Sequence, residues 1–101
     1  MNEAKEKARK FIKSLSKSGI KVNKAYIFGS YAKGKAKKDS DIDVCVISSS
    51  FSKDYFAEIV RLRKYSLKID SRIEPVPFSP KDLNDKYSTL ASEIRKFGIP
   101  L

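Results

Sequence analysis

The 101-residue chain contains no histidine and only one cysteine, Cys45. Without an imidazole, Ser-His-Asp and Cys-His nucleophilic devices are excluded, and so are the usual Cys/His zinc sites. A single cysteine cannot form a disulfide within the chain, which agrees with a reducing compartment. Any catalysis must therefore use carboxylates, lysines, hydroxyls or a bound cation.

Long hydrophobic runs are also missing. No apolar stretch approaches the ~18 residues of a membrane span. The first ten residues, MNEAKEKARK, lack the apolar centre of a signal peptide. The hydrophobic share of 41% is typical of a globular protein. We expect a soluble cytoplasmic protein with a single domain, residues 1–101.

Acidic residues are few relative to basic ones. The chain has 22 Lys and Arg against 12 Asp and Glu, which gives a formal net charge of +10. Such an excess favours anionic partners, which include phosphates, nucleic acid and acidic protein surfaces. Lysine-rich surfaces also serve solubility alone, so charge by itself does not choose between these interpretations.

The first part of the chain predicts a helix, a strand and a short helix. Apolar residues at helical spacing predict an amphipathic helix over 2–18, ended by Gly19. Residues 22–28 read as a strand. Ser30 fits the N-cap of a short helix over 31–34.

The remainder alternates strands and helices. Residues 41–48 become nearly all apolar, which favours an inner strand. A second helix starts within SSSFSKD and ends near residue 67. Residues 68–78 are extended and contain two prolines, which place them at a sheet edge. A last helix begins at Ser79-Pro80 and runs to about Phe97. The order predicts an α/β domain with a short sheet backed by helices.

Two aspartates, Asp41 and Asp43, stand at the start of the predicted inner strand. Residues two apart in a strand project to one face, with Cα atoms ~6.5–7 Å apart. Two ionised carboxylates this close repel each other. Protonation, a bound cation or solvent at the strand end must reduce that repulsion. A divalent ion such as Mg²⁺ is held well by one or two carboxylates plus substrate phosphate oxygens. The alternative is a pair of solvated residues at a strand start.

Gly29-Ser30 closes the preceding strand. A glycine lets a phosphate approach the backbone, and a helix N-terminus after it would present N–H groups to an anion. Lys33 and further lysines up to Lys38 follow, although such a run is often only a solvated loop. The pattern predicts a nucleoside triphosphate site, but neither a P-loop nor a dinucleotide fingerprint is present.

Gly29-Ser30, ten intervening residues and then Asp41-Ile42-Asp43 resemble the signature of the DNA polymerase β-like nucleotidyltransferases. The short chain resembles the minimal nucleotidyltransferases, in the branch of the MntA-like antitoxins. The resemblance implies an α/β core with a small mixed sheet of three or four strands packed against helices. It also implies that Gly29, Ser30 and Lys33 bind the nucleotide, although the family often has arginine at the position of Lys33.

The resemblance further implies a third carboxylate on a neighbouring strand. Glu74 and Asp70 are the candidates, and alternation along the strand does not separate them because they share parity. Glu74 is favoured because it lies within the better strand, SRIEPVPF. The family more commonly has aspartate there, and glutamate is one methylene longer.

The implied activity is transfer of a nucleoside monophosphate, AMP from ATP, onto an acceptor hydroxyl. Asp41, Asp43 and Glu74 would hold two Mg²⁺ ions, with Mn²⁺ as a substitute. Relatives of this size commonly pair with a HEPN-type toxin and act as its antitoxin, and some modify a tyrosine of that partner.

Two other functions stay open from the sequence. The chain could be a catalytically weak binding module that neutralises its partner by contact. It could also bind nucleic acid through its positive charge, but no recognition helix or aromatic RNA-binding motif is visible.

Overall fold

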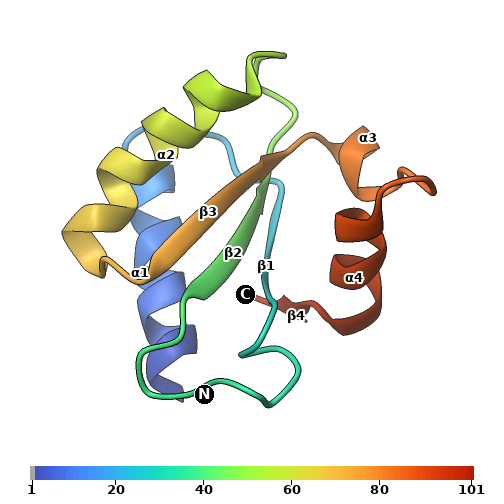
Figure 1. Cartoon of the computed structure of the whole chain (residues 1–101). Helices are drawn as coiled ribbons and strands as arrows, with labels where there is room; N and C mark the ends of the chain where they lie inside the picture. The colour runs from blue at the N-terminus through green and yellow to red at the C-terminus, as the bar shows by residue number, and fades with distance from the viewer. Residues whose placement is uncertain (1) are drawn as a thin grey trace.

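The fold is a four-stranded mixed sheet with helices on both faces (Figure 1). The structure is a computed structural model and describes residues 2–101. The helices are α1 (Asn2–Lys17), α2 (Tyr55–Ile69), α3 (Pro80–Leu83) and α4 (Thr89–Phe97). The strands are β1 (Lys24–Phe28), β2 (Ile42–Ile47), β3 (Ile73–Phe78) and β4 (Ile99–Pro100). The predicted α/β class is confirmed.

The strands lie in the order β3-β2-β1-β4. Strand β1 is antiparallel to β2 and β4, whereas β2 and β3 are parallel. The prediction that the proline-containing strand lies at an edge is confirmed. The carbonyls of Arg72 and Phe78 accept hydrogen bonds from the backbone N–H groups of Ile42 and of Ser48, which follows β2. The backbone positions of Pro75 and Pro77 alternate with these and face the open edge of the sheet, where no N–H donor is needed.

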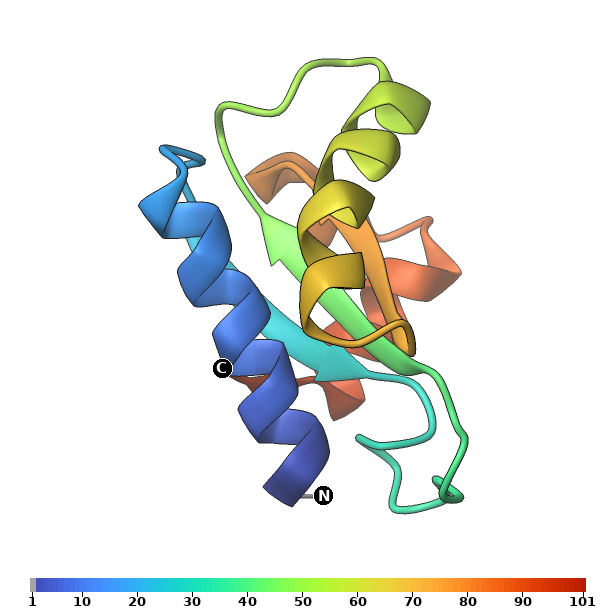
Figure 2. The same ribbon diagram turned by 90° about the vertical axis from the view of Figure 1, so that its left-hand side faces the viewer.

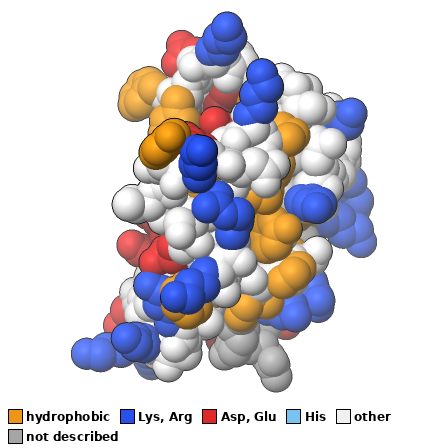
Figure 3. Space-filling view, turned by 90° about the vertical axis from the view of Figure 1, so that its right-hand side faces the viewer, with side chains coloured by type: hydrophobic (Ala, Val, Ile, Leu, Met, Phe, Trp, Pro, Cys, Tyr) orange, Lys and Arg blue, Asp and Glu red, His pale blue; other side chains and the backbone are white. Residues whose placement is uncertain are grey.

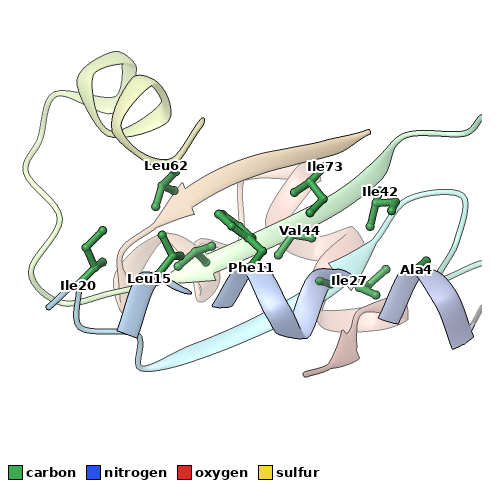
Figure 4. Close-up of a cluster of buried hydrophobic side chains, with 11 residues drawn as sticks. Ala4, Phe11, Leu15, Ile20, Ile27, Ile42, Val44, Leu62 and Ile73 are labelled. Carbon is green, nitrogen blue, oxygen red and sulfur yellow. The ribbon is translucent and has the colours of Figure 1, made fainter. Parts of the chain in front are cut away.

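Helices α1 and α2 cover one face of the sheet (Figure 2). Their apolar stripes meet the sheet side chains in one cluster, where the side chains point toward one another (Figure 4). Phe11, Leu15, Ile27, Val44 and Leu62 are all fully buried there. Full burial of side chains of this kind stabilises the fold by about 1.5–3 kcal/mol each.

Helix α4 covers the opposite face, and a second cluster lies beneath it. Cys45 belongs to this cluster and is fully buried, and burial raises the pKa of its thiol to about 12. The interpretation of Cys45 as a small buried hydrophobe is therefore supported. Figure 3 looks onto this side of the molecule, where Lys and Arg side chains project at many points around apolar atoms.

Several predicted boundaries are wrong. Residues 31–34 form turns and not a helix, and β2 begins at Ile42, which leaves Asp41 just before the strand. Helix α2 continues through Ile69, so the extended segment starts later than expected. The last helix is two helices, because Ser79 caps α3 and Ser88 starts α4 with a new N-cap. Strand β4 was not predicted at all.

No helix within residues 2–101 is both long and apolar enough to cross a membrane.

Candidate functional site

The candidate residues meet where β1 ends and β2 and β3 begin. Because β1 is antiparallel to β2, its last residue, Phe28, pairs with Asp43 near the start of β2. Because β3 is parallel to β2, its first residues lie at the same end, and Glu74 pairs with Asp43 on the other side. The topology thus brings together segments that are 45 residues apart in the sequence.

Gly29 and Ser30 lie in a turn directly after β1. The backbone N–H of Lys33 donates to the carbonyl of Gly29 at 3.1 Å, and that of Lys35 donates to the carbonyl of Ser30 at 2.9 Å. These bonds close single turns that do not continue as a helix. The predicted N-cap at Ser30 is therefore wrong, and an anion site here cannot depend on a helix dipole.

Gly29 is in close contact with Asp43. Its φ is +72°, and a Cβ added there would lie 2.2 Å from Oδ2 of Asp43. Any side chain would collide with the carboxylate and would also adopt a strained backbone. The positive φ and the close approach of Asp43 thus both favour glycine at this position, and the second reason was not visible in the sequence alone.

Asp43 is half-buried on the α4 face of the sheet, and Asp41 is exposed at the strand entrance. Burial, followed by the charges of Asp41, Glu74 and Glu93, raises the pKa of Asp43 to about 6. The raised pKa means that partial removal from water, and then the neighbouring negative charges, disfavour the ionised form of Asp43. Strongly perturbed carboxylates of this kind are typical of functional sites.

Glu74 is oriented toward the same site but is held by an arginine. Its carboxylate accepts a hydrogen bond from Arg63 Nη1 of α2 at 2.7 Å. The same Nη1 lies 3.4 Å from the carbonyl of Ile73. Both side chains are more than one third exposed, so the ion pair is a solvated one with a modest energy.

Asp70 lies outside this group of carboxylates. It precedes β3 and accepts hydrogen bonds from the backbone N–H, Nε and Nη2 of Arg72. These bonds lower the pKa of Asp70 to about 2. Arg72 also donates to Glu3 of α1 and to the carbonyl of Lys38. The geometry gives Asp70 and Arg72 a structural role, in which they fasten the loop and α1 to the sheet.

Lys33 and Glu93 form a pair that sequence reasoning missed. Lys33 Nζ donates to Glu93 Oε1 of α4 at 2.5 Å, and the ammonium lies 5.3 Å from the centroid of the Phe97 ring. Glu93 also contributes to the raised pKa of Asp43. Its position in a late helix offered no sequence signal, because the contact depends on how α4 folds back onto the sheet.

The donor set suits a hard divalent cation. All the acidic groups supply oxygen ligands. Burial and then the neighbouring carboxylates raise the pKa of Asp43, and a bound cation would offset both effects by stabilising the ionised form. Within residues 2–101, no three His, Cys, Asp or Glu side chains gather closely enough to hold an ion by themselves. Mg²⁺ needs only one or two carboxylates when substrate phosphates and water complete its shell, so Asp41 and Asp43 fit that requirement.

A family model described as "Nucleotidyltransferase domain" matches residues 5–97 of the chain. The chain therefore belongs to the nucleotidyltransferase family, and it is a nucleotidyltransferase enzyme. A relative in Methanocaldococcus jannaschii, "Putative protein adenylyltransferase MJ1379", is 38% identical over 69 residues, which cover 68% of each chain. The resemblance to this family, stated from the Gly-Ser and Asp-x-Asp spacing, is confirmed.

Solved structures share the fold. "A putative nucleotidyltransferase from Sulfolobus solfataricus" superimposes with a TM-score of 0.71 at 18% identity, covering 94% of this chain and 76% of that one. A chain of "the toxin-antitoxin with AMP-PNP" superimposes with a TM-score of 0.62 at 24% identity, covering 92% and 70%. At these identities the likeness concerns the fold.

Proposed function

We propose that this nucleotidyltransferase moves AMP from ATP onto a hydroxyl of a protein acceptor in a metal-dependent reaction. The observation that carries the proposal is the placement of Asp41, Asp43 and Glu74 at the same end of the sheet, beside a Gly29-Ser30 turn in contact with Asp43. The relative in M. jannaschii bears the name of a protein adenylyltransferase, and one structural neighbour was crystallised with AMP-PNP.

Each residue has a role in this proposal. Asp41 and Asp43 hold Mg²⁺, or Mn²⁺, with Glu74 completing sites for two ions. Bound ions would neutralise charge on the phosphates and on the attacking and leaving oxygens. Glu74 is released from Arg63 and accepts the proton of the acceptor hydroxyl. The acceptor oxygen bonds to the α-phosphorus, the bond from that phosphorus to the bridging oxygen breaks, and pyrophosphate leaves.

Gly29, Ser30 and Lys33 bind the β- and γ-phosphates in this account. The carbonyls of Gly29 and Ser30 are bonded within the turn, so the backbone there is already ordered before a ligand arrives. Lys33 leaves Glu93 to meet the phosphate charge. Lysine offers a point charge here, without the two-pronged geometry of an arginine.

The acceptor in this proposal is a HEPN-type toxin, and the chain acts as its cytoplasmic antitoxin. A structural neighbour described as a toxin-antitoxin supports a toxin as the partner, and the HEPN type is part of the proposal. In this proposal the Asp41–Asp43 site holds the nucleotide through a cation, and the acceptor hydroxyl comes from a second protein that reaches the same end of the sheet.

The reaction type is tested with two labels. The purified chain is incubated with Mg²⁺, cell extract from its own source and ATP labelled on either the α- or the γ-phosphate. Nucleotidyl transfer leaves the α-label on protein and sends the γ-label into pyrophosphate. Extract without the chain gives the background for both labels. A rise in γ-label on protein above that background, or no α-label above it from any of the four triphosphates with Mg²⁺ or Mn²⁺, would contradict the proposal.

A second candidate is a binding module that neutralises a partner by contact. The observation that favours it is the ion pair between Arg63 and Glu74, which occupies the proposed third carboxylate. Under this candidate, neutralisation of the partner continues unchanged when Asp41 and Asp43 are both replaced by asparagine. If the chain acts as an enzyme, the same double variant no longer neutralises the partner but still binds it.

A further inference from the structure

The outer face of α2 exposes apolar side chains in a line. Phe56 is 74% exposed, Val60 44% and Leu67 55%. Their spacing of four and seven residues places them on one side of the helix. That side is turned away from the buried positions of α2, which include Leu62 and Ser66. Figure 2 looks onto this helix, and no other element of residues 2–101 lies over it.

The line of apolar residues borders a hollow. A shallow groove of about 380 Å³ is lined by Ile59, Val60, Arg63, Lys64 and Leu67. We call this surface, together with Phe56, the α2 groove. A groove bordered by apolar side chains is the kind of surface that receives the apolar face of an amphipathic helix.

The charge around the α2 groove is basic. Helix α2 carries Arg61, Arg63, Lys64 and Lys68, and its single acidic residue, Glu58, is buried. A second copy of this chain seated symmetrically would bring the basic residues of one groove against the same basic surface of the other. Such like-charge contacts are costly at an interface, so a self-complementary dimer is disfavoured and an acidic occupant is favoured.

The α2 groove is continuous with the candidate site through one residue. Arg63 lines the groove and also donates to Glu74, the residue opposite Asp43. An acidic side chain on a seated helix would therefore compete with Glu74 for Arg63. An occupied groove would therefore favour release of Glu74 from Arg63.

We propose that the α2 groove is the docking surface for an acidic amphipathic helix of the protein that receives the nucleotide. The inference rests on the proposed function in one respect, which is that the protein that docks is also the acceptor of AMP. Phe56, Val60 and Leu67 supply apolar contact area, and Arg63 and Lys64 pair with carboxylates of the partner helix. Docking also releases Glu74, so arrival of the acceptor and readiness of the site are coupled.

The test uses a photo-crosslinking amino acid, p-benzoylphenylalanine, placed at position 60 in the full chain. The chain is expressed in its own source cells, and cross-linked peptides are identified by mass spectrometry. Position 13, an exposed lysine on α1, carries the same probe as a matched control. We expect position 60, but not position 13, to cross-link to a protein helix rich in Asp and Glu with apolar residues along one side.

Two substitutions sharpen the result. Leu67→Glu and Lys64→Glu both act on exposed side chains, and each should reduce the cross-link yield about tenfold or more, which corresponds to ~1.4 kcal/mol. Lys13→Glu makes the same charge reversal away from the groove and should change the yield little. Thermal melting of each variant checks that the fold is kept.

The other outcomes overturn the inference. Cross-links from position 60 to a second copy of this chain, to nucleic acid or to a basic surface would overturn it. So would a cross-link yield no higher than at position 13, or a yield that Leu67→Glu does not change. The same measurement in the Asp41→Asn/Asp43→Asn background separates the two claims. The double variant should still dock. If it docks but no longer transfers AMP, the result tests the proposed chemistry and leaves the docking inference standing.

Discussion

Glu74 of β3 lies directly opposite Asp43 of β2 in the parallel register of the two strands. Residues paired in this way project from the same face of the sheet. The charge of Glu74 accordingly helps to raise the pKa of Asp43. Asp70, the competing candidate for the third carboxylate, is instead bound by Arg72 before the strand begins. The structure thus separates two residues whose shared parity the sequence could not.

The first prediction compares these two acids. Glu74→Gln keeps the size of the side chain but removes a carboxylate from beside Asp43, so kcat for AMP transfer should fall by at least about 100-fold. Asp70→Asn should leave kcat close to the wild-type value and lower the midpoint of thermal unfolding, because it loses bonds to Arg72. Steady-state kinetics and thermal melting of both variants provide the measurement. The reverse pattern would assign the role to Asp70.

The second prediction concerns the contact between Gly29 and Asp43. Gly29→Ala places a methyl group 2.2 Å from the Asp43 carboxylate at a φ of +72°. Gly34 has nearly the same φ, +71°, but open space around its Cβ position. Gly34→Ala therefore measures the backbone strain alone.

Gly29→Ala should lower the free energy of unfolding by at least about 1 kcal/mol more than Gly34→Ala does, because overpacking adds to the strain. It should also reduce AMP transfer, since Asp43 must move. Urea denaturation and activity assays of the two variants test this. Equal losses of stability would show that the contact with Asp43 is unimportant.

The third prediction is a pH dependence of stability. The pKa of Asp43 is about 6 in the folded protein against 3.8 for the free residue, so the folded state binds more protons between these values. Asp43 thus destabilises the fold increasingly as pH rises from about 4 to above 6. Asp43→Asn should be more stable than wild type by about 1 kcal/mol near pH 8, less than the full shift implies because solvent screens the charge. The difference should vanish near pH 4.

Urea denaturation in the presence of a metal chelator provides this measurement. Asp41→Asn is the matched control, because Asp41 is exposed and the same substitution there removes a charge with less desolvation. A variant Asp43→Asn that is less stable than wild type near pH 8 would contradict the burial and the neighbouring charges assigned to Asp43.

The fourth prediction is that substitutions at Lys33 and Glu93 change the KM for ATP differently. Lys33→Ala removes a charge proposed to meet the phosphates, so the KM for ATP should rise about tenfold, or ~1.4 kcal/mol. Glu93→Gln loosens the hold on Lys33 and removes an acid near Asp43, so the KM should stay the same or fall. Steady-state kinetics at varied ATP decides this. A KM raised equally by both substitutions would mean that the pair acts as a structural unit.

Much of the fold could be predicted because local patterns and tertiary context agree. The amphipathic stripe of α1 and the apolar run of β2 are strong signals, and both elements are present. The prolines of β3 correctly indicated an edge. The prediction of a short helix after Ser30 was wrong because the hydrogen bonds there close single turns. The prediction of one last helix was wrong because Ser88 caps a new helix, α4.

The candidate site was predictable only in its local parts. Gly29-Ser30 and the Asp41–Asp43 pair are adjacent enough in sequence to be recognised by spacing. Glu93 and Arg63 reach the site from helices whose placement depends on the whole fold, and no short motif marks them. The two-residue strand β4 is held by pairing with β1, including Ile27 with Ile99, and has too few residues to show a period.

The central claim is that Asp41 and Asp43 support transfer of AMP. The most direct measurement is the transfer of label from α-labelled ATP to protein with Mg²⁺, by wild type and by Asp41→Asn/Asp43→Asn. The account predicts labelled protein with wild type, a loss of at least about 1,000-fold in the double variant, and no label when Mg²⁺ and Mn²⁺ are chelated. Label transfer by the double variant at the wild-type rate would contradict it.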